Sequence, residues 1–209
     1  MYTKARQKQV DKILAMLVVF LKYVEECDLI VEALNGSFMS KFHIYTDGSA
    51  RFNPGKGGWS MVAMNEEGSE ILCVESGYED HVTNNRMELK AMICALCYAE
   101  SHPRDTFTII SDSAYVVNSC NSWIRGWAAN GWRNSKKVTV ENVDLMKALW
   151  GYISREFPNF EIKHCKGHNG DLGNELADAL ATKDLKKFEN LIEFWELQPP
   201  AGDNWFPID

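Results

Sequence analysis

The sequence has no apolar run long enough to span a membrane. Its longest candidate, residues 13–21, covers nine residues and ends at Lys22, whereas a membrane-spanning helix needs about 20 such residues. The chain also has no internal repeat and no low-complexity tract. With an ordinary apolar content of 45%, it is expected to be a globular cytoplasmic protein without a membrane partner.

The six cysteines have no repeating spacing, and no signal peptide is evident ahead of them. Reduced thiols are therefore expected. Cys94 and Cys97 form a C-x-x-C pair, but they lie in the apolar run 92–99 and no second pair exists. Buried thiols are a better interpretation of this pair than a metal or redox site.

The chain also lacks the positive charge usual for a nucleic-acid-binding protein, because its formal net charge is −7. The excess is uneven: residues 1–40 carry a net charge of 0, residues 41–183 carry −3 and residues 184–209 carry −4. Part of the acidity therefore belongs to the tail. Four carboxylates of the middle segment are assigned below to metal binding, where a bound cation offsets their charge.

Hydrophobic periodicity predicts one α/β domain between two extensions. Residues 4–34 have helical spacing and end at Asn35-Gly36-Ser37, which gives a helical N-terminal extension 1–38, a central domain 41–183 and a helical or irregular tail 184–209. Strands are expected at 41–46, 59–64, 70–78, 106–110 and 160–164, and helices at 85–100, 113–119, 143–157 and 174–188. Three strands in an antiparallel meander, followed by two parallel strands alternating with helices, imply a mixed five-stranded sheet with helices on both faces.

Two aspartates follow strands that this topology places side by side. Asp47 ends the first strand and Asp112 follows the fourth. If these strands are parallel neighbours, both carboxylates emerge at one sheet edge, where sites in open α/β sheets form. Aspartate in a D-G or S-D-S context is also a common turn former or helix N-cap, so each residue has a structural alternative.

Two further acidic residues have structural alternatives of their own. Asn85-x-x-Glu88 fits a helix capping box, and Asp178 shares a helix face with Asn174 and could be an ordinary surface acid. Taken together with Asp47 and Asp112, the set indicates a different role. Four carboxylates in one place repel each other unless divalent cations neutralise them, and oxygen ligands of this kind suit Mg²⁺ or Mn²⁺.

Four short motifs occur in a fixed order along residues 41–183. They are Thr46-Asp47-Gly48-Ser49, Thr83-Asn84-Asn85-Arg86-Met87-Glu88-Leu89, Ser111-Asp112-Ser113-x-Tyr115-Val116, and Lys166-Gly167-His168 followed by Asn174-Glu175-x-x-Asp178. This ordered set resembles the type 1 ribonuclease H family, which includes ribonuclease HI. The resemblance implies a ribonuclease-H-like fold and hydrolysis of the RNA strand of RNA–DNA hybrids, leaving 5′-phosphate and 3′-hydroxyl ends.

The resemblance also implies roles for individual residues. Asp47, Glu88, Asp112 and Asp178 match the family's catalytic metal-binding tetrad, which holds two Mg²⁺ ions in the active complex, and Mn²⁺ is a possible substitute. His168 matches the mobile-loop histidine that assists proton transfer or product release. Its setting between Lys166-Gly167 and Asn169-Gly170 independently suits a flexible loop.

Polar residues around the acids match the family's contacts with the hybrid. They are Asn53, Thr83, Asn84, Asn85 and Asn174. Hydroxyl and amide side chains can contact the 2′-OH groups that distinguish RNA from DNA in a wide minor groove. The chain departs from the pattern at Ala114, where better-known bacterial enzymes have a glutamine, and this puts one substrate contact in doubt.

The stretch 113–140 contains no aspartate or glutamate and resembles the family's basic protrusion, or handle. Its basic and tryptophan residues are Arg125, Arg133, Lys136, Lys137, Trp123, Trp127 and Trp132. Such a segment can follow a phosphate backbone, although the tryptophans could instead anchor the protruding helix. Ala128-Ala129-Asn130 stands where lysine and arginine are common, so hybrid binding is expected to be weaker and less salt-sensitive than a fully basic handle would give.

Three functions remain open at this point. The first is the metal-dependent ribonuclease H itself, with the RNA–DNA hybrid as its partner. The second is a catalytically silent hybrid-binding module, against which the four carboxylates and His168 count. The third is a ribonuclease H domain acting with a reverse transcriptase. A monomer is favoured, and the N-terminal helix could dock on the domain, form a dimer or bind a partner.

Overall fold

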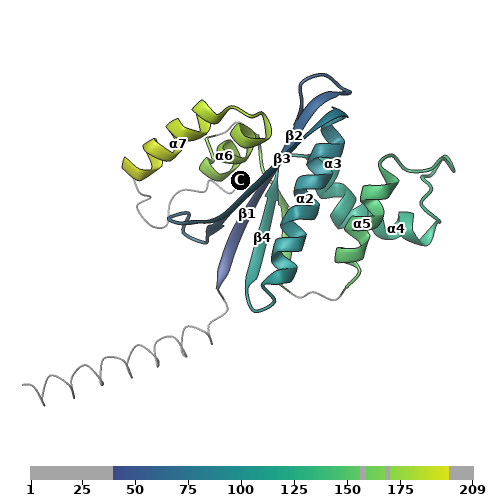
Figure 1. The fold of residues 1–209 in the computed structure, drawn as a ribbon. Coiled ribbons are helices and arrows are strands. Elements are labelled where there is room, and N and C mark those ends of the chain that lie inside the picture. The colour runs from purple at the N-terminus through teal and green to yellow at the C-terminus, as the bar shows by residue number, and fades with distance from the viewer. Residues whose placement is uncertain (1–39, 156–158, 168–169, 198–209) are drawn as a thin grey trace, which may run out of the picture. The chain divides into compact units, whose positions relative to one another are not determined.

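The computed structural model describes residues 40–155, 159–167 and 170–197. The extension 1–38, for which a helix is predicted, and the end of the tail, 198–209, lie outside the described residues. The described chain forms a five-stranded sheet in the order β3-β2-β1-β4-β5 (Figure 1). Its strands are Lys41–Ala50 (β1), Gly55–Asn65 (β2), Ile71–Val82 (β3), Thr106–Ser111 (β4) and Phe160–His164 (β5).

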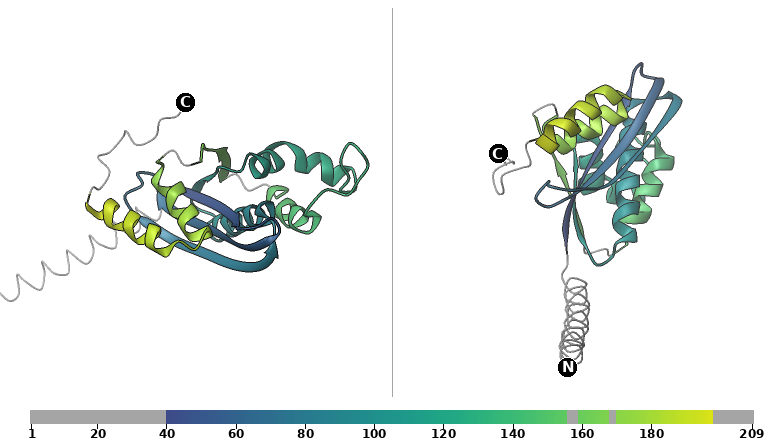
Figure 2. Two further views of the ribbon diagram at one scale, coloured as in Figure 1. Left: turned by 90° about the horizontal axis from the view of Figure 1, so that it is seen from above. Right: turned by 60° about the vertical axis from the view of Figure 1, so that its left-hand side comes forward.

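The strand directions confirm the predicted mixed sheet. β1, β2 and β3 form the antiparallel meander, whereas β4 pairs parallel with β1 and β5 pairs parallel with β4. Helices cover both faces, with α2 on one side and α6 and α7 on the other (Figures 1 and 2). The helices are Asn84–Ser101 (α2), Ala114–Asn118 (α3), Ile124–Ala129 (α4), Val143–Ile153 (α5), Leu172–Ala181 (α6) and Leu185–Leu197 (α7).

Alternation along the central strands explains why the sheet is covered on both faces. On β1, Ile44 packs into the core beneath α2 and α5, whereas its neighbour Tyr45 packs into the core beneath α6. On β2, Met61 packs into the core beneath α2 and α5, and Val62 packs into the core beneath α6. Successive strand side chains point to opposite faces, so strands apolar at both positions need a helical layer on each side.

Two of the predicted elements whose bounds differ in the structure carry predicted site residues. The strand expected to end at residue 46 continues to Ala50, so Asp47 lies within β1. The single helix expected over 174–188 is divided into α6 and α7. Lys183 has a left-handed backbone conformation (φ 62°), which an α-helix cannot accommodate, and Asp184 then caps α7 by accepting a hydrogen bond from the Lys187 N–H at 2.9 Å.

The segment after α3 also differs from a simple helix. A π-helical turn, Ser119–Trp123, joins α3 to α4, and the chain then returns toward α5 through an isolated bridge between Arg133 and Thr139. Among the described residues, no helix combines the length and apolar character needed to cross a membrane.

Candidate active site

Asp47 and Asp112 lie at matching positions of neighbouring strands. β1 and β4 are parallel with Thr46 opposite Ser111, and the Thr46 hydroxyl donates to the Ile110 carbonyl oxygen at 3.3 Å. Asp47 directly follows Thr46, and Asp112 directly follows Ser111. The alternative role of Asp112 as a helix cap is not observed, because the Ser113 side chain caps α3. The structure thus brings together the two carboxylates that the strand pattern placed at one sheet edge.

Glu88 reaches the same place from α2 because the helix packs directly on β1. A Cβ atom at Gly48 would lie 2.0 Å from the Glu88 backbone nitrogen, so only glycine permits this approach. The capping alternative for Glu88 is not observed either, because Thr83 is the N-cap of α2 and accepts from the Arg86 N–H. Glu88 instead lies one turn beyond the first residue of α2, Asn84, and is 5% exposed.

The three carboxylates form a compact acidic cluster, here called the triad. Asp47, Glu88 and Asp112 each offer an oxygen atom, and these oxygens lie within 4.8 Å of one another. Burial raises the pKa of Glu88 well above its usual value, and the charges of Asp47 and Asp112 raise it further. The Glu88 Oε2 atom is buried and has no hydrogen-bond partner among the described residues. A hard divalent cation fits this donor set, because carboxylate oxygens are its preferred ligands and its charge offsets their mutual repulsion.

The raised pKa of Glu88 gives a testable pH dependence. Folding favours its protonated form, so this contribution to stability is present at low pH and is lost as the pH rises from the ordinary value of 4.5 through the raised pKa. We expect Glu88→Gln to raise the melting temperature of the metal-free protein by a few degrees at pH 8 and by less at pH 5. Thermal unfolding in EDTA across this range measures it, with the exposed Glu67→Gln as control. An equal gain at both pH values would contradict the assignment.

Asp178, the fourth predicted carboxylate, is not part of the triad within the described structure. It lies on α6, and its Oδ2 atom accepts a hydrogen bond from Lys187 Nζ at 2.7 Å. The position of α6 is fixed by the Ser60 hydroxyl, which donates to the Ala177 carbonyl oxygen at 2.7 Å, and by the Tyr78 hydroxyl, which donates to the Leu180 carbonyl oxygen at 2.7 Å. The role of Asp178 as a metal ligand stays a prediction.

His168 lies outside the described residues, but the chain just before it approaches the triad. A Cβ atom at Gly167 would lie 2.4 Å from Asp112 Oδ2. Cys165, two residues earlier, has a pKa raised to about 12 by burial and by nearby carboxylates that include Asp112 and Asp47. The sequence motifs do not single out Cys165. The parallel pairing of β4 and β5 explains its position, because it places the residue after β5 beside the residue after β4.

The polar residues predicted to contact the hybrid are arranged around the N-terminus of α2. Asn53 accepts a hydrogen bond from the Asn84 N–H at 3.2 Å, and the Asn84 side chain accepts from the Ala50 N–H at 3.0 Å. Thr83 caps the helix, and Asn85 lies in its first turn. Asn174 is different: it is 2% exposed, and its amide oxygen accepts from the Cys165 thiol at 3.5 Å. The hybrid contacts of all five stay predictions.

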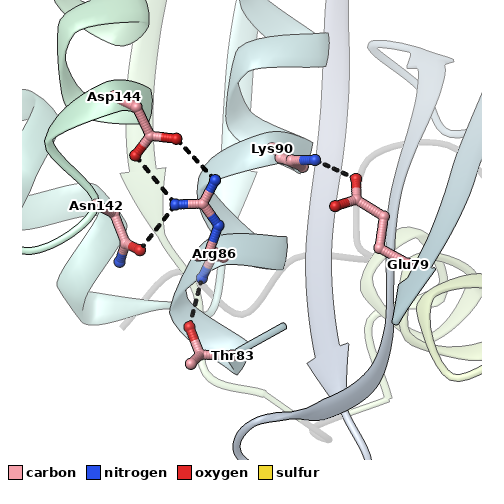
Figure 3. Close-up of polar contacts among 6 residues, drawn as sticks. All are labelled: Glu79, Thr83, Arg86, Lys90, Asn142 and Asp144. Carbon is pink, nitrogen blue, oxygen red and sulfur yellow. Dashed lines mark hydrogen bonds and ion pairs between the residues drawn. The ribbon is translucent and has the colours of Figure 1, made fainter. Parts of the chain in front are cut away.

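Arg86 is a residue whose role the sequence motifs did not indicate. Its guanidinium group donates two hydrogen bonds to the Asp144 carboxylate, at 3.0 and 2.7 Å, and a third to Asn142 Oδ1 at 3.3 Å (Figure 3). On the next turn of α2, Lys90 forms an ion pair with Glu79 of β3 (Figure 3). These contacts fix the helical turns that flank Glu88 against both α5 and the sheet edge.

We expect Arg86→Ala to lower the free energy of unfolding by about 1 kcal/mol, since a bidentate pair is stronger than most surface pairs but solvent weakens it. Asp144 is 59% exposed, which keeps the effect modest. Urea denaturation measures it. Lys41→Met, which removes the more exposed Lys41–Glu66 pair, is the control and should change stability by no more than about 0.3 kcal/mol. Equal effects for both variants would contradict a special role for Arg86.

The handle combines anchoring and exposed side chains. Trp127 and Trp132 pack against the core, whereas Trp123 is 41% exposed with its ring 5.6 Å from that of Trp127. The Arg133 guanidinium donates to the Lys137 carbonyl oxygen at 2.8 Å, which commits it to the handle's own backbone. The side chains that remain exposed and basic include those of Arg125, Lys136 and Lys137.

The fold and the triad define the class of protein. A mixed five-stranded sheet in the order β3-β2-β1-β4-β5, with a carboxylate cluster where β1, β4 and α2 meet, is that of a ribonuclease-H-like hydrolase. Residues 39–186 match the RNase H family. The chain is 42% identical over 149 residues to the Ribonuclease H of Herminiimonas arsenicoxydans, an alignment that covers 71% of this chain and 97% of that protein.

Other comparisons agree. The Ribonuclease H of Jannaschia sp. (strain CCS1) is 45% identical over 147 residues, with 69% of this chain and 91% of that protein covered. The solution structure of the PFV RNase H domain superposes with a TM-score of 0.61 at 29% identity, covering 71% of this chain and 96% of that domain. The chain therefore belongs to the ribonuclease H family of metal-dependent endoribonucleases.

Proposed function

We propose that this protein hydrolyses the RNA strand of RNA–DNA hybrids at a divalent-metal site formed by Asp47, Glu88 and Asp112, with Asp178 as a fourth ligand. The observation that carries the proposal is the close approach of three carboxylate oxygens, two of them on buried residues. Divalent ions bound there would supply an activated water and neutralise charge during in-line attack at phosphorus. Mg²⁺ is the expected ion and Mn²⁺ its substitute.

The protein's own residues would divide the remaining work. The triad residues lie on β1, directly after β4 and on α2, so packed secondary structure would hold their oxygens in place with little reorganisation. Asn53, Thr83, Asn84 and Asn85 would bind the hybrid's backbone beside the triad. His168, on the loop that approaches Asp112 at Gly167, would move a proton or assist product release. The products would carry 5′-phosphate and 3′-hydroxyl ends.

The triad also bears on the two alternatives. A silent hybrid-binding module has no use for a carboxylate whose pKa is raised by burial and by its acidic neighbours, because binding alone gains nothing from burying and crowding these charges. The alignment with a protein named simply Ribonuclease H covers 97% of that protein, which favours an independent enzyme over a partner of a reverse transcriptase. We place the catalytic domain at residues 41–183, with 1–38 and 184–209 as its extensions.

Cleavage of a uniformly labelled RNA–DNA hybrid tests the proposal, with single-stranded RNA and double-stranded RNA as parallel substrates. Only the hybrid should be cut in Mg²⁺ or Mn²⁺. Extension of the products by a polymerase would report 3′-hydroxyl ends. Equal cleavage of single-stranded RNA, or no cleavage with either ion, would contradict the proposal.

The handle predicts the salt dependence of hybrid binding. Each phosphate neutralised by a lysine or arginine steepens the plot of log affinity against log salt by about one unit. Since Arg133 is bound to the handle's backbone, we expect a slope shallower than about −5. Fluorescence anisotropy of a labelled hybrid in EDTA would measure it, with a Lys136→Gln/Lys137→Gln variant as comparison. A steeper slope in the wild type would mean more phosphate contacts than this handle provides.

A further inference from the structure

Lys187 of α7 makes two ion pairs with α6. Its Nζ atom lies 2.7 Å from Asp178 Oδ2 and 2.6 Å from Glu175 Oε2, and the three side chains are 31%, 21% and 17% exposed respectively. Lys187 also lies just beyond residues 39–186, which match the family. The ammonium group that neutralises the fourth predicted metal ligand is therefore supplied by a segment outside the matched region.

Lys187 is held in place by the packing of its helix. Phe188, Leu191 and Ile192 pack against the core beneath α6, and the Trp195 indole N–H donates to the Gly68 carbonyl oxygen at 3.0 Å. The two helices lie side by side on the same face of the sheet (Figures 1 and 2). These contacts do not depend on the lysine, so α7 would present its position 187 to Asp178 even without the charge.

We infer that Lys187 is a positioning residue that competes with the divalent cation for Asp178, so that α7 sets the metal affinity of the active site. The inference rests on the proposed function, in which Asp178 is the fourth ligand. A metal ion that binds Asp178 through Oδ2 must replace the ammonium group already in hydrogen-bond contact with that oxygen. Even where the lysine stays nearby, its positive charge repels the incoming cation. Both effects have the same sign, so loss of the charge strengthens metal binding.

The size of the effect follows from the charges involved. Two unit charges about 4 Å apart attract or repel each other even in water, and more strongly near a protein surface. The repulsion between the lysine and a divalent ion is twice that between the lysine and a monovalent ion at the same distance. Loss of the Lys187 charge is therefore expected to lower the dissociation constant for the ion nearest Asp178 by about tenfold.

The test is a titration of the full chain with Mn²⁺ alone at low ionic strength, following free Mn²⁺ by electron paramagnetic resonance. The variants are Lys187→Gln, Lys187→Arg and Lys186→Gln. Lys186 is the matched control because it is the neighbouring lysine of α7 and, among the described residues, has no ion pair with Asp178. Melting temperatures measured without metal would verify that each variant is folded.

Tighter Mn²⁺ binding by Lys187→Gln, with wild-type affinity in Lys187→Arg and Lys186→Gln, would support the inference. The Mg²⁺ concentration that gives half-maximal cleavage should fall in the same variant. Unchanged or weaker binding by Lys187→Gln, or equal strengthening by Lys186→Gln, would overturn the inference while leaving the proposed function intact. If the wild type bound no Mn²⁺ in either the absence or presence of hybrid, the proposed function itself would fail.

Discussion

Asp112→Asn is expected to lower hybrid cleavage by about a thousandfold or more while raising the stability of the metal-free protein. The loss of activity follows because a metal ligand supplies several kcal/mol of transition-state stabilisation, and about 4 kcal/mol corresponds to a thousandfold in rate. The gain in stability follows because the Asp112 charge is one cause of the raised pKa of Glu88. An amide of the same shape removes this repulsion.

These opposite effects separate a metal ligand from a structural aspartate. Cleavage in Mg²⁺ and thermal unfolding in EDTA would be measured on the same preparations. Asp80→Asn makes the same chemical change at an exposed position of β3 and should leave both measurements near wild type. Cleavage by Asp112→Asn within tenfold of wild type would rule out a central role for this carboxylate, and a lower melting temperature would show that Asp112 stabilises the fold.

Gly48→Ala is expected to lower the free energy of unfolding by about 3 kcal/mol and cleavage by about a hundredfold. The added Cβ would lie 2.0 Å from the Glu88 nitrogen and 2.3 Å from the Met87 carbonyl carbon. Both atoms belong to the α2 backbone, so no side-chain rotation relieves the clash. The helix must move away from β1 and take the Glu88 carboxylate with it.

Gly126→Ala is the matched control, because a Cβ there meets nothing within 4 Å and the residue lies in α4. Alanine is the better helix former by about 1 kcal/mol, so this variant should be neutral or slightly stabilised. Urea denaturation and cleavage assays on both variants would test the contrast. If Gly48→Ala matched Gly126→Ala in stability and rate, the close packing of α2 on β1 would not be what positions Glu88.

Much of the site could be predicted because the signals for Asp47 and Asp112 are local. Each follows a short β-branched or aromatic stretch of sequence, and sites in open α/β sheets form at the edge where parallel neighbouring strands end. Their register then places the two residues at equivalent positions, as Thr46 opposite Ser111 shows. The sequence allows two roles for Glu88, because Asn85-x-x-Glu88 fits a capping box as well as a metal ligand. Only the structure distinguishes the two, since Thr83 takes the cap position.

Other features depend on contacts between distant parts of the chain. Arg86 and Asp144 are 58 residues apart, and nothing in either local sequence indicates that they pair. The need for glycine at position 48 arises from α2, not from β1 itself. The break between α6 and α7 has no local sequence signal, because Thr182-Lys183-Asp184 contains neither glycine nor proline, and the left-handed conformation that Lys183 adopts is rare for lysine.

Anomalous diffraction from crystals grown with Mn²⁺ would show directly whether the triad binds the catalytic metal. We expect an anomalous peak among Asp47, Glu88 and Asp112, at about 2.0–2.3 Å from their carboxylate oxygens. Dissolved crystals should cleave hybrid. An active crystal whose Mn²⁺ peaks lay elsewhere, with these three carboxylates free of metal, would contradict the account.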